Sequence, residues 1–189
     1  FTYPLAHAPT LKNVSFKIAS GETVAITGPT GSGKSTIAAL LTRMYDINSG
    51  SVYVNDEAID KINLHDLRRK TGYVPQEVFL FSDTVKNNIA FGLPDDNSAF
   101  EKVTQAAKDA EVHGNILGFP DVYETVVGER GVTLSGGQKQ RISIARAIIK
   151  EPELLIFDDC LSAVDTETED KIVTNLKRIM KGRSSVIIS

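Results

Sequence analysis

The sequence predicts an α/β fold in which a mostly helical segment interrupts an alternating core. Short segments of strand character lie at 23–27, 51–54, 71–74, 154–158 and 185–188. Segments with helical periodicity separate them, and the pattern is mostly helical from residue 84 to residue 150. Strand and helix signals that alternate on both sides of a helical insert are typical of an α/β core with an inserted helical subdomain.

The first segments predict a hairpin-like β portion that leads into the core. Val14, Phe16 and Ile18 alternate with polar residues, and the turn-forming residues 20–22 follow them. The next segment, 23–27, reads TVAIT and is typical of a short buried strand. We therefore expect an antiparallel β portion near the N-terminus.

The helices that follow are predicted from apolar stripes and from capping residues. A helix is expected at 36–44 because Ile37, Leu40 and Leu41 share one side, and another around 64–69. Ser98 to Glu101 forms a capping box, and Asp165 precedes a helix with a core-packing stripe made of Ile172, Val173, Leu176, Ile179 and Met180.

Size and composition fit one globular domain and exclude some classes of partner. The chain has 189 residues, of which 41% are hydrophobic and 24% charged. Its net charge is −3 and its Lys and Arg residues are dispersed, so we expect no binding of DNA or RNA. No apolar run approaches the roughly 20 residues of a membrane span, and no signal peptide opens the chain, so we expect an aqueous compartment. The single cysteine, Cys160, fits a reducing cytosol and is expected to be a packed thiol.

The residues GPTGSGKS at 28–35 form a phosphate-binding loop between the predicted strand 23–27 and the predicted helix 36–44. Gly28, Gly31 and Gly33 lack a Cβ, so successive backbone N–H groups can approach phosphate oxygens. Lys34 would reach the β- and γ-phosphates, and the Ser35 hydroxyl would ligate Mg²⁺. The loop predicts a nucleotide phosphate site at a helix N-terminus.

Two further motifs predict site residues: one supplies a pair of carboxylates, and the other begins a second helix that could bind an anion. LLIFDD at 154–159 is an apolar strand that would deliver Asp158 to a metal and Asp159 towards an attacking water; a solvated strand end is the alternative. In LSGGQ at 134–138, Ser135 and Gln138 form a capping box, and Gly136 and Gly137 expose N–H groups to an anion.

In this order the three motifs resemble those of the nucleotide-binding domain of an ATP-binding cassette (ABC) transporter, over essentially the whole chain. Tyr3 resembles the aromatic residue that stacks on adenine, 28–35 the Walker A loop and 154–159 the Walker B strand. Residues 73–76 (YVPQ) resemble the Q-loop, 134–138 the signature and 161–165 (LSAVD) the D-loop. The stretches 84–92 and 127–131 are similar to ones found particularly in ABC exporters.

The resemblance implies a P-loop NTPase core with a mixed or parallel sheet, an N-terminal antiparallel β portion and an inserted helical subdomain. Residues 1–189 would form a single domain, with an ATP-binding core at 1–76 and 151–189 and a helical signature subdomain at 77–150. The implied ATP contacts are Tyr3, Gly28, Thr30, Gly31, Ser32, Gly33, Lys34, Ser35 and Thr36. Mg²⁺ would be held by Ser35, Gln76 and Asp158. The catalytic residues would be Asp159, Gln76 and Lys34.

The resemblance also implies partners and a location. Two such domains, identical or different, would close head to tail with ATP between the Walker A loop of one and Ser135, Gly136, Gly137 and Gln138 of the other. Closure and hydrolysis would drive an exporter's transmembrane domain, on the cytoplasmic face of a membrane (the inner membrane in a bacterium).

Two departures from the family pattern leave alternatives open. Asp159 stands where the family usually has Glu; it is shorter by roughly 1.5 Å, and a misplacement of about 1 Å can lower a rate on the order of 10²-fold. The family's switch histidine would follow Ser189, a place that His7, His65 and His113 do not occupy. A slow or non-hydrolysing regulatory module is the main alternative. A soluble ABC protein of DNA repair or translation is a weaker one, because only residues 77–133 separate the Q-loop from the signature and the chain holds one cassette.

Overall fold

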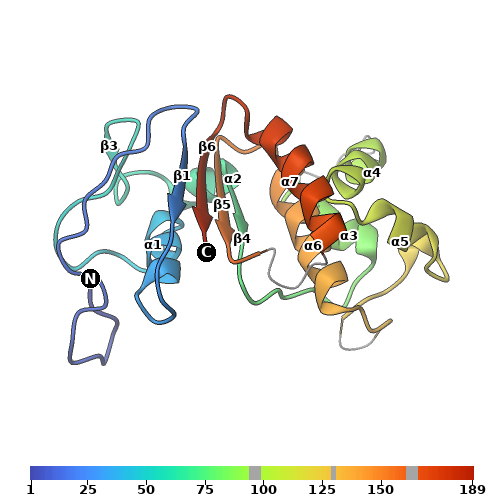
Figure 1. The fold of residues 1–189 in the computed structure, drawn as a ribbon, viewed down its shortest axis with the longest axis horizontal. Helices are drawn as coiled ribbons and strands as arrows, with labels where there is room; N and C mark the ends of the chain where they lie inside the picture. Colours follow the sequence, from blue (N-terminus) through green and yellow to red (C-terminus); the bar gives the residue numbers. More distant parts are fainter. Residues whose placement is uncertain (94–98, 129–130, 161–165) are drawn as a thin grey trace.

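The computed structural model describes residues 1–93, 99–128, 131–160 and 166–189. Its centre is a parallel sheet of β1 (Thr23–Ile26), β4 (Thr71–Val74), β5 (Leu154–Asp158) and β6 (Ser184–Ile188), in the order β1-β6-β5-β4 (Figure 1). Ser98, the D-loop 161–165 and residues 129–130 lie outside the described residues, so the first capping box and the predicted N-cap Asp165 are not assessed.

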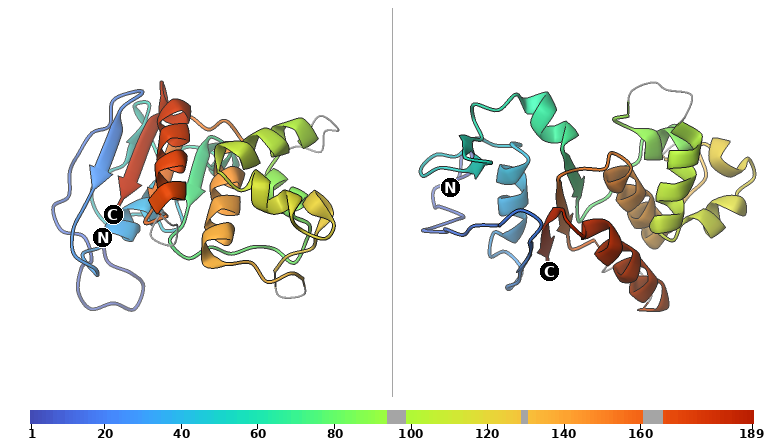
Figure 2. Two further views of the ribbon diagram at one scale, coloured as in Figure 1. Left: turned by 45° about the vertical axis from the view of Figure 1, so that its right-hand side comes forward. Right: turned by 90° about the horizontal axis from the view of Figure 1, so that it is seen from above.

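Side chains that alternate along β5 and β6 bury both faces of this sheet. Ile156, Val186 and Ile188 pack with Ala38 of α1 (Lys34–Leu41) on one face. Leu155 belongs to the larger apolar cluster on the other face, which also holds residues of α6 (Gly136–Ile148) and α7 (Thr166–Met180). Strands buried on both faces read as continuous apolar runs, as LLIF does here. The sheet therefore separates α1 from α6 and α7, as Figures 1 and 2 show.

Other helices pack around α6, away from α1. They are α3 (Val85–Ala90), α4 (Ala99–Asp109), α5 (His113–Leu117) and the short 3₁₀ helix η1 (Val122–Glu124). Their fully buried side chains include Val85, Ile89, Val103 and Ile116, which share a cluster with Ile142 of α6. A Cβ on Gly72 of β4 would lie 2.6 Å from the Ala147 carbonyl oxygen of α6, so glycine allows this helix to approach the sheet. Among the described residues, no helix is both long and apolar enough to span a bilayer.

A small antiparallel pair accompanies the parallel sheet, which confirms the mixed α/β fold class. It consists of β2 (Tyr53–Val54) and β3 (Glu57–Ala58). Asn55 and Asp56 join them with φ of 51° and 64°, the left-handed pair that a two-residue hairpin turn requires. The helix α2 (Leu64–Arg69) follows, and the Asn63 side chain accepts hydrogen bonds from its first N–H groups.

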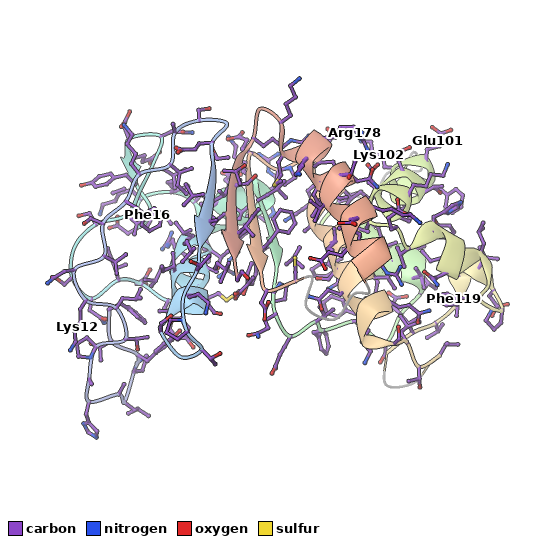
Figure 3. All side chains as sticks on the ribbon, viewed as in Figure 1. Lys12, Phe16, Glu101, Lys102, Phe119 and Arg178 are labelled. Atoms are coloured by element: carbon purple, nitrogen blue, oxygen red, sulfur yellow. The ribbon has the colours of Figure 1, made fainter. Side chains whose placement is uncertain are left out.

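The predicted hairpin at 14–22 is wrong. Residues 14–18 lie within the described range and form no strand, and β1 pairs with β6 alone among the described residues. Val14 is 50% exposed and Phe16, labelled in Figure 3, is 48% exposed, so their alternation with polar residues does not reflect a buried face. The antiparallel portion is instead the β2–β3 pair, whose first strand is shorter than the expected 51–54.

The helix predicted at 36–44 spans Lys34–Leu41 instead. It begins earlier because the phosphate loop leads directly into its first turn, with Gly33 as the N-cap. It ends earlier because Arg43 has a left-handed φ of 47°, a conformation that cannot continue a helix.

Candidate functional site

The loop between β1 and α1 presents the amino end of that helix to a ligand. Gly31 and Gly33 have φ of 82° and 91°, a region that glycine adopts without strain. Gly33 is the N-cap and α1 has no side-chain capping hydrogen bond, so its first N–H groups are not satisfied by a cap. A helix start of this kind binds an anion.

The segment at residues 1–11 packs against the loop. A Cβ on Gly33 would come within 2.9 Å of Leu11 Cδ2 and 3.2 Å of the Thr10 carbonyl oxygen. Gly33 is therefore required by close approach as well as by its φ. The backbone N–H of Thr2 donates to Asn48 Oδ1 at 2.6 Å, which ties the same segment to the residues after α1.

Lys34 folds back over the loop. Its Nζ donates to the carbonyl oxygens of Gly28 at 2.6 Å and Pro29 at 3.2 Å. The ammonium therefore lies beside the same loop whose N–H groups would receive a phosphate.

Asp158 ends β5 and lies against the first turn of α1. It is 2% exposed, and its Oδ1 accepts a hydrogen bond from Ser35 Oγ at 3.0 Å across 123 residues of sequence. Its Oδ2 accepts a hydrogen bond from the Tyr73 hydroxyl at 3.4 Å. Burial, then the Asp158 charge, raises the pKa of Tyr73 to about 12, so the phenol remains a donor at neutral pH.

This pairing fits a divalent cation of the Mg²⁺ type. The hydroxyl and carboxylate oxygens of Ser35 and Asp158 are hard ligands at adjacent positions, and Mg²⁺ is usually held by few protein oxygens together with phosphates. Within the described ranges, no group of three or more His, Cys, Asp and Glu side chains could hold a metal by itself. A Mg²⁺ ion bound here would take its remaining ligands from phosphate oxygens and water.

Asp159 points to a different partner from Asp158. Its Oδ2 accepts a hydrogen bond from Gln76 Nε2 at 3.0 Å, and its N–H donates to the Ile188 carbonyl oxygen at 2.9 Å. Its φ of 45° turns the chain at the end of β5. The structure thus brings together Asp159 and Gln76, both predicted to be catalytic, beside the Ser35–Asp158 pair.

Tyr3 lies next to the first turn of α1. Its hydroxyl shares a hydrogen bond of 2.9 Å with Thr36 Oγ1, and its ring contacts those of Phe1 and Tyr45. Tyr73 and Tyr45 were not among the predicted site residues. No local signal in the sequence indicates the contact of Tyr73 with Asp158 or that of Tyr45 with Tyr3.

The signature residues begin α6 as predicted. Gln138 N–H donates to Ser135 Oγ at 3.2 Å, and Ser135 N–H donates to Gln138 Oε1 at 3.0 Å, which confirms the capping box. Figure 1 shows α1 and α6 both beginning where the parallel strands end, on opposite sides of the sheet. One chain therefore does not bring the start of α6 into the site at the start of α1.

Cys160, directly after the Asp pair, is buried, as predicted. Burial raises the pKa of its thiol to about 12. The thiol is a packing group rather than a nucleophile at neutral pH.

Known proteins are similar to this chain along nearly its whole length. The family model described as ABC transporter matches residues 11–162. The chain is 50% identical to the uncharacterized ABC transporter ATP-binding protein YfiB of Bacillus subtilis over 92% of its length, covering 30% of that protein. It is 49% identical to the multidrug resistance-like ATP-binding protein MdlA of Escherichia coli, over 99% of this chain and 31% of that protein.

A solved structure of a bacterial Atm1-family ABC exporter with ATP bound is also similar. It superimposes with a TM-score of 0.90 at 42% identity, over 95% of this chain and 31% of that chain. The chain thus spans less than a third of the length of each of these proteins.

Proposed function

The chain belongs to the ABC transporter family as an exporter-type ATP-binding domain, and we propose that it hydrolyses MgATP to power export across a membrane. The observation that carries this proposal is the 3.0 Å hydrogen bond between Ser35 Oγ and Asp158 Oδ1. It joins the phosphate loop to the carboxylate at the end of β5, the pairing that a nucleotide-bound divalent cation uses.

The triphosphate would lie at the amino end of α1. The N–H groups of loop 28–35 and the Lys34 ammonium would bind its oxygens, and Tyr3 would stack on the base. Mg²⁺ would be held by Ser35, Asp158 and Gln76, and would neutralise charge on the phosphates.

Asp159 would act on the attacking water. Its carboxylate would accept a proton as the water oxygen bonds to the γ-phosphorus, while the bond from that phosphorus to the β–γ bridging oxygen breaks, leaving ADP and phosphate. The contact of Asp159 Oδ2 with Gln76 Nε2 supports this role, because it orients the carboxylate beside the other residue predicted to be catalytic.

A second nucleotide-binding domain, identical or different, would complete the site. The Ser135 helix start is built for an anion, yet its own chain holds its phosphate loop on the other side of the sheet. Head-to-tail pairing would bring residues 135–138 of one copy to the γ-phosphate held by Lys34 of the other. In the full-length protein the partner would be an exporter's transmembrane domain, and the site would lie on the cytoplasmic side.

Phosphate release by the full-length protein tests the proposal and its main alternative. We expect tight MgATP binding and slow release that Asp159→Glu raises, because Glu restores about 1.5 Å of reach. Asp159→Asn, which keeps the size but cannot accept the proton, should reduce release to background. A protein that holds ATP and shows no gain with Asp159→Glu would instead be a regulatory module.

A further inference from the structure

Three aromatic rings meet where the base of the nucleotide would bind. The Tyr3 ring lies 4.9 Å from Phe1 at an interplanar angle of 81° and 5.0 Å from Tyr45 at 88°, measured between ring centroids. Both neighbours are thus edge-on, and neither stacks in parallel on Tyr3. The arrangement is favourable for aromatic pairs and does not use the parallel stacking that a planar base requires.

Polar contacts hold the turn that carries Tyr45. Arg43 Nη1 donates to the carbonyl oxygens of Ile59 at 3.1 Å and Ile62 at 2.9 Å. Arg68 of α2 donates from Nη2 to the Arg43 carbonyl oxygen at 2.9 Å. Tyr45 is therefore presented from a turn that is fixed to the segments around β3 and α2.

The opposite end of the Tyr3 side chain is held by α1 itself. The Tyr3 hydroxyl shares its hydrogen bond with Thr36 Oγ1, in the first turn, whereas Tyr45 follows the last turn. The helix has eight residues and is therefore about 12 Å long. The amino end of α1 would thus face the phosphates. The turn after its carboxyl end carries Tyr45, which supports the Tyr3 ring that would stack on the base.

We propose that Tyr45 is a positioning residue that holds the Tyr3 ring in the orientation for stacking on the base. This inference rests on the proposed function, since it assumes that Tyr3 contacts the base of a nucleotide. Tyr45 acts through Tyr3 and does not touch the phosphates. It therefore affects the affinity for a ligand with a base and leaves the affinity for a base-free ligand unchanged.

The test compares the affinity of the full-length protein for MgATP with its affinity for inorganic tripolyphosphate in the presence of Mg²⁺. Tyr45→Leu should weaken MgATP binding about three- to tenfold, the range that one aromatic pair contributes. Tripolyphosphate binding should not change. Tyr45→Phe should behave like the wild type, because the contact uses the ring. Tyr53→Leu is the matched control, since Tyr53 is a 63% exposed tyrosine on β2.

Each outcome decides the inference. Unchanged MgATP affinity in Tyr45→Leu overturns it, and so does an equal loss for both ligands, which would indicate general damage to α1. Tyr45→Met keeps most of the side-chain volume without a ring. If Tyr45→Leu unfolds, Tyr45→Met must show the weaker MgATP binding and the unchanged tripolyphosphate binding. Lys34→Ala should weaken the binding of both MgATP and tripolyphosphate. If it does so and Tyr45→Leu leaves the MgATP affinity unchanged, the proposed function stands and this inference fails.

Discussion

Replacing Arg146 tests how α6 is attached to the segment that follows Gln76. Arg146 Nε and Nη2 donate to the carbonyl oxygen and Oδ1 of Asn88 at 2.8 and 2.7 Å, and Nη1 donates to the Phe79 carbonyl oxygen at 2.9 Å. The guanidinium also lies 5.4 Å from the centroid of the Phe81 ring. Burial lowers the pKa of Arg146 to about 10, the sign of a charge removed from water.

Arg146→Met keeps the apolar stem and removes all these contacts. Hydrogen bonds from a charged donor contribute about 1.5 kcal/mol each at the low end, and the cation–π contact about 0.5 kcal/mol. The total of about 5 kcal/mol is partly offset because the cation no longer has to be desolvated. We expect the free energy of unfolding to fall by about 3 kcal/mol. Arg146→Lys keeps the charge but lacks the planar guanidinium group, so it should lower the free energy of unfolding by about half as much.

Urea-induced unfolding followed by circular dichroism measures these losses. The matched control is Arg69→Met, because Arg69 is paired with Asp66 at 3.6 Å and both side chains lie at the surface, 60% and 54% exposed. That change should lower the free energy of unfolding by less than about 1 kcal/mol. A loss below about 1 kcal/mol for Arg146→Met, or equal losses at the two positions, would refute the reasoning.

Three further changes have defined outcomes. Gly72→Ala places a Cβ 2.6 Å from the Ala147 carbonyl oxygen and should lower the free energy of unfolding by about 1–3 kcal/mol, measured by urea denaturation; an unchanged midpoint would contradict it. Ser135→Ala removes the cap that Gln138 N–H donates to and should cost about 1 kcal/mol, seen as faster hydrogen exchange in the first turn of α6. Because burial raises the pKa of Cys160 to about 12, iodoacetamide at pH 8 should label the native thiol far more slowly than the unfolded one, and rapid native labelling would exclude a packed thiol.

The parts of the fold set by local signals were predictable. Strands β4 and β5 and helix α2 begin and end where the sequence predicts them; β5 starts with the apolar run LLIF, and the structure adds the Asn63 cap of α2. The alternation at 14–18 predicted a strand wrongly because period two indicates a strand only when one side is buried. There both Val14 and Phe16 are about half exposed, at 50% and 48%.

In the site, too, some features follow from local sequence signals and others do not. Its loop and its Asp pair follow from motifs with fixed spacing, and the contact of Ser35 with Asp158 follows from strands that end at one edge of a sheet. The contacts of Tyr45 with Tyr3 and of Tyr73 with Asp158 join segments far apart in the chain. Spacing within one segment carries no information about such contacts, so only the folded arrangement reveals them.

Equilibrium titration of MgATP into the wild-type protein and the Lys34→Ala variant tests the central claim most directly. If the loop at 28–35 grips a triphosphate, the variant loses charge-assisted hydrogen bonds worth about 3 kcal/mol, and its affinity should fall about 100-fold. Lys12→Ala, at an exposed lysine labelled in Figure 3, should bind as the wild type does. Undiminished affinity in Lys34→Ala would contradict the account.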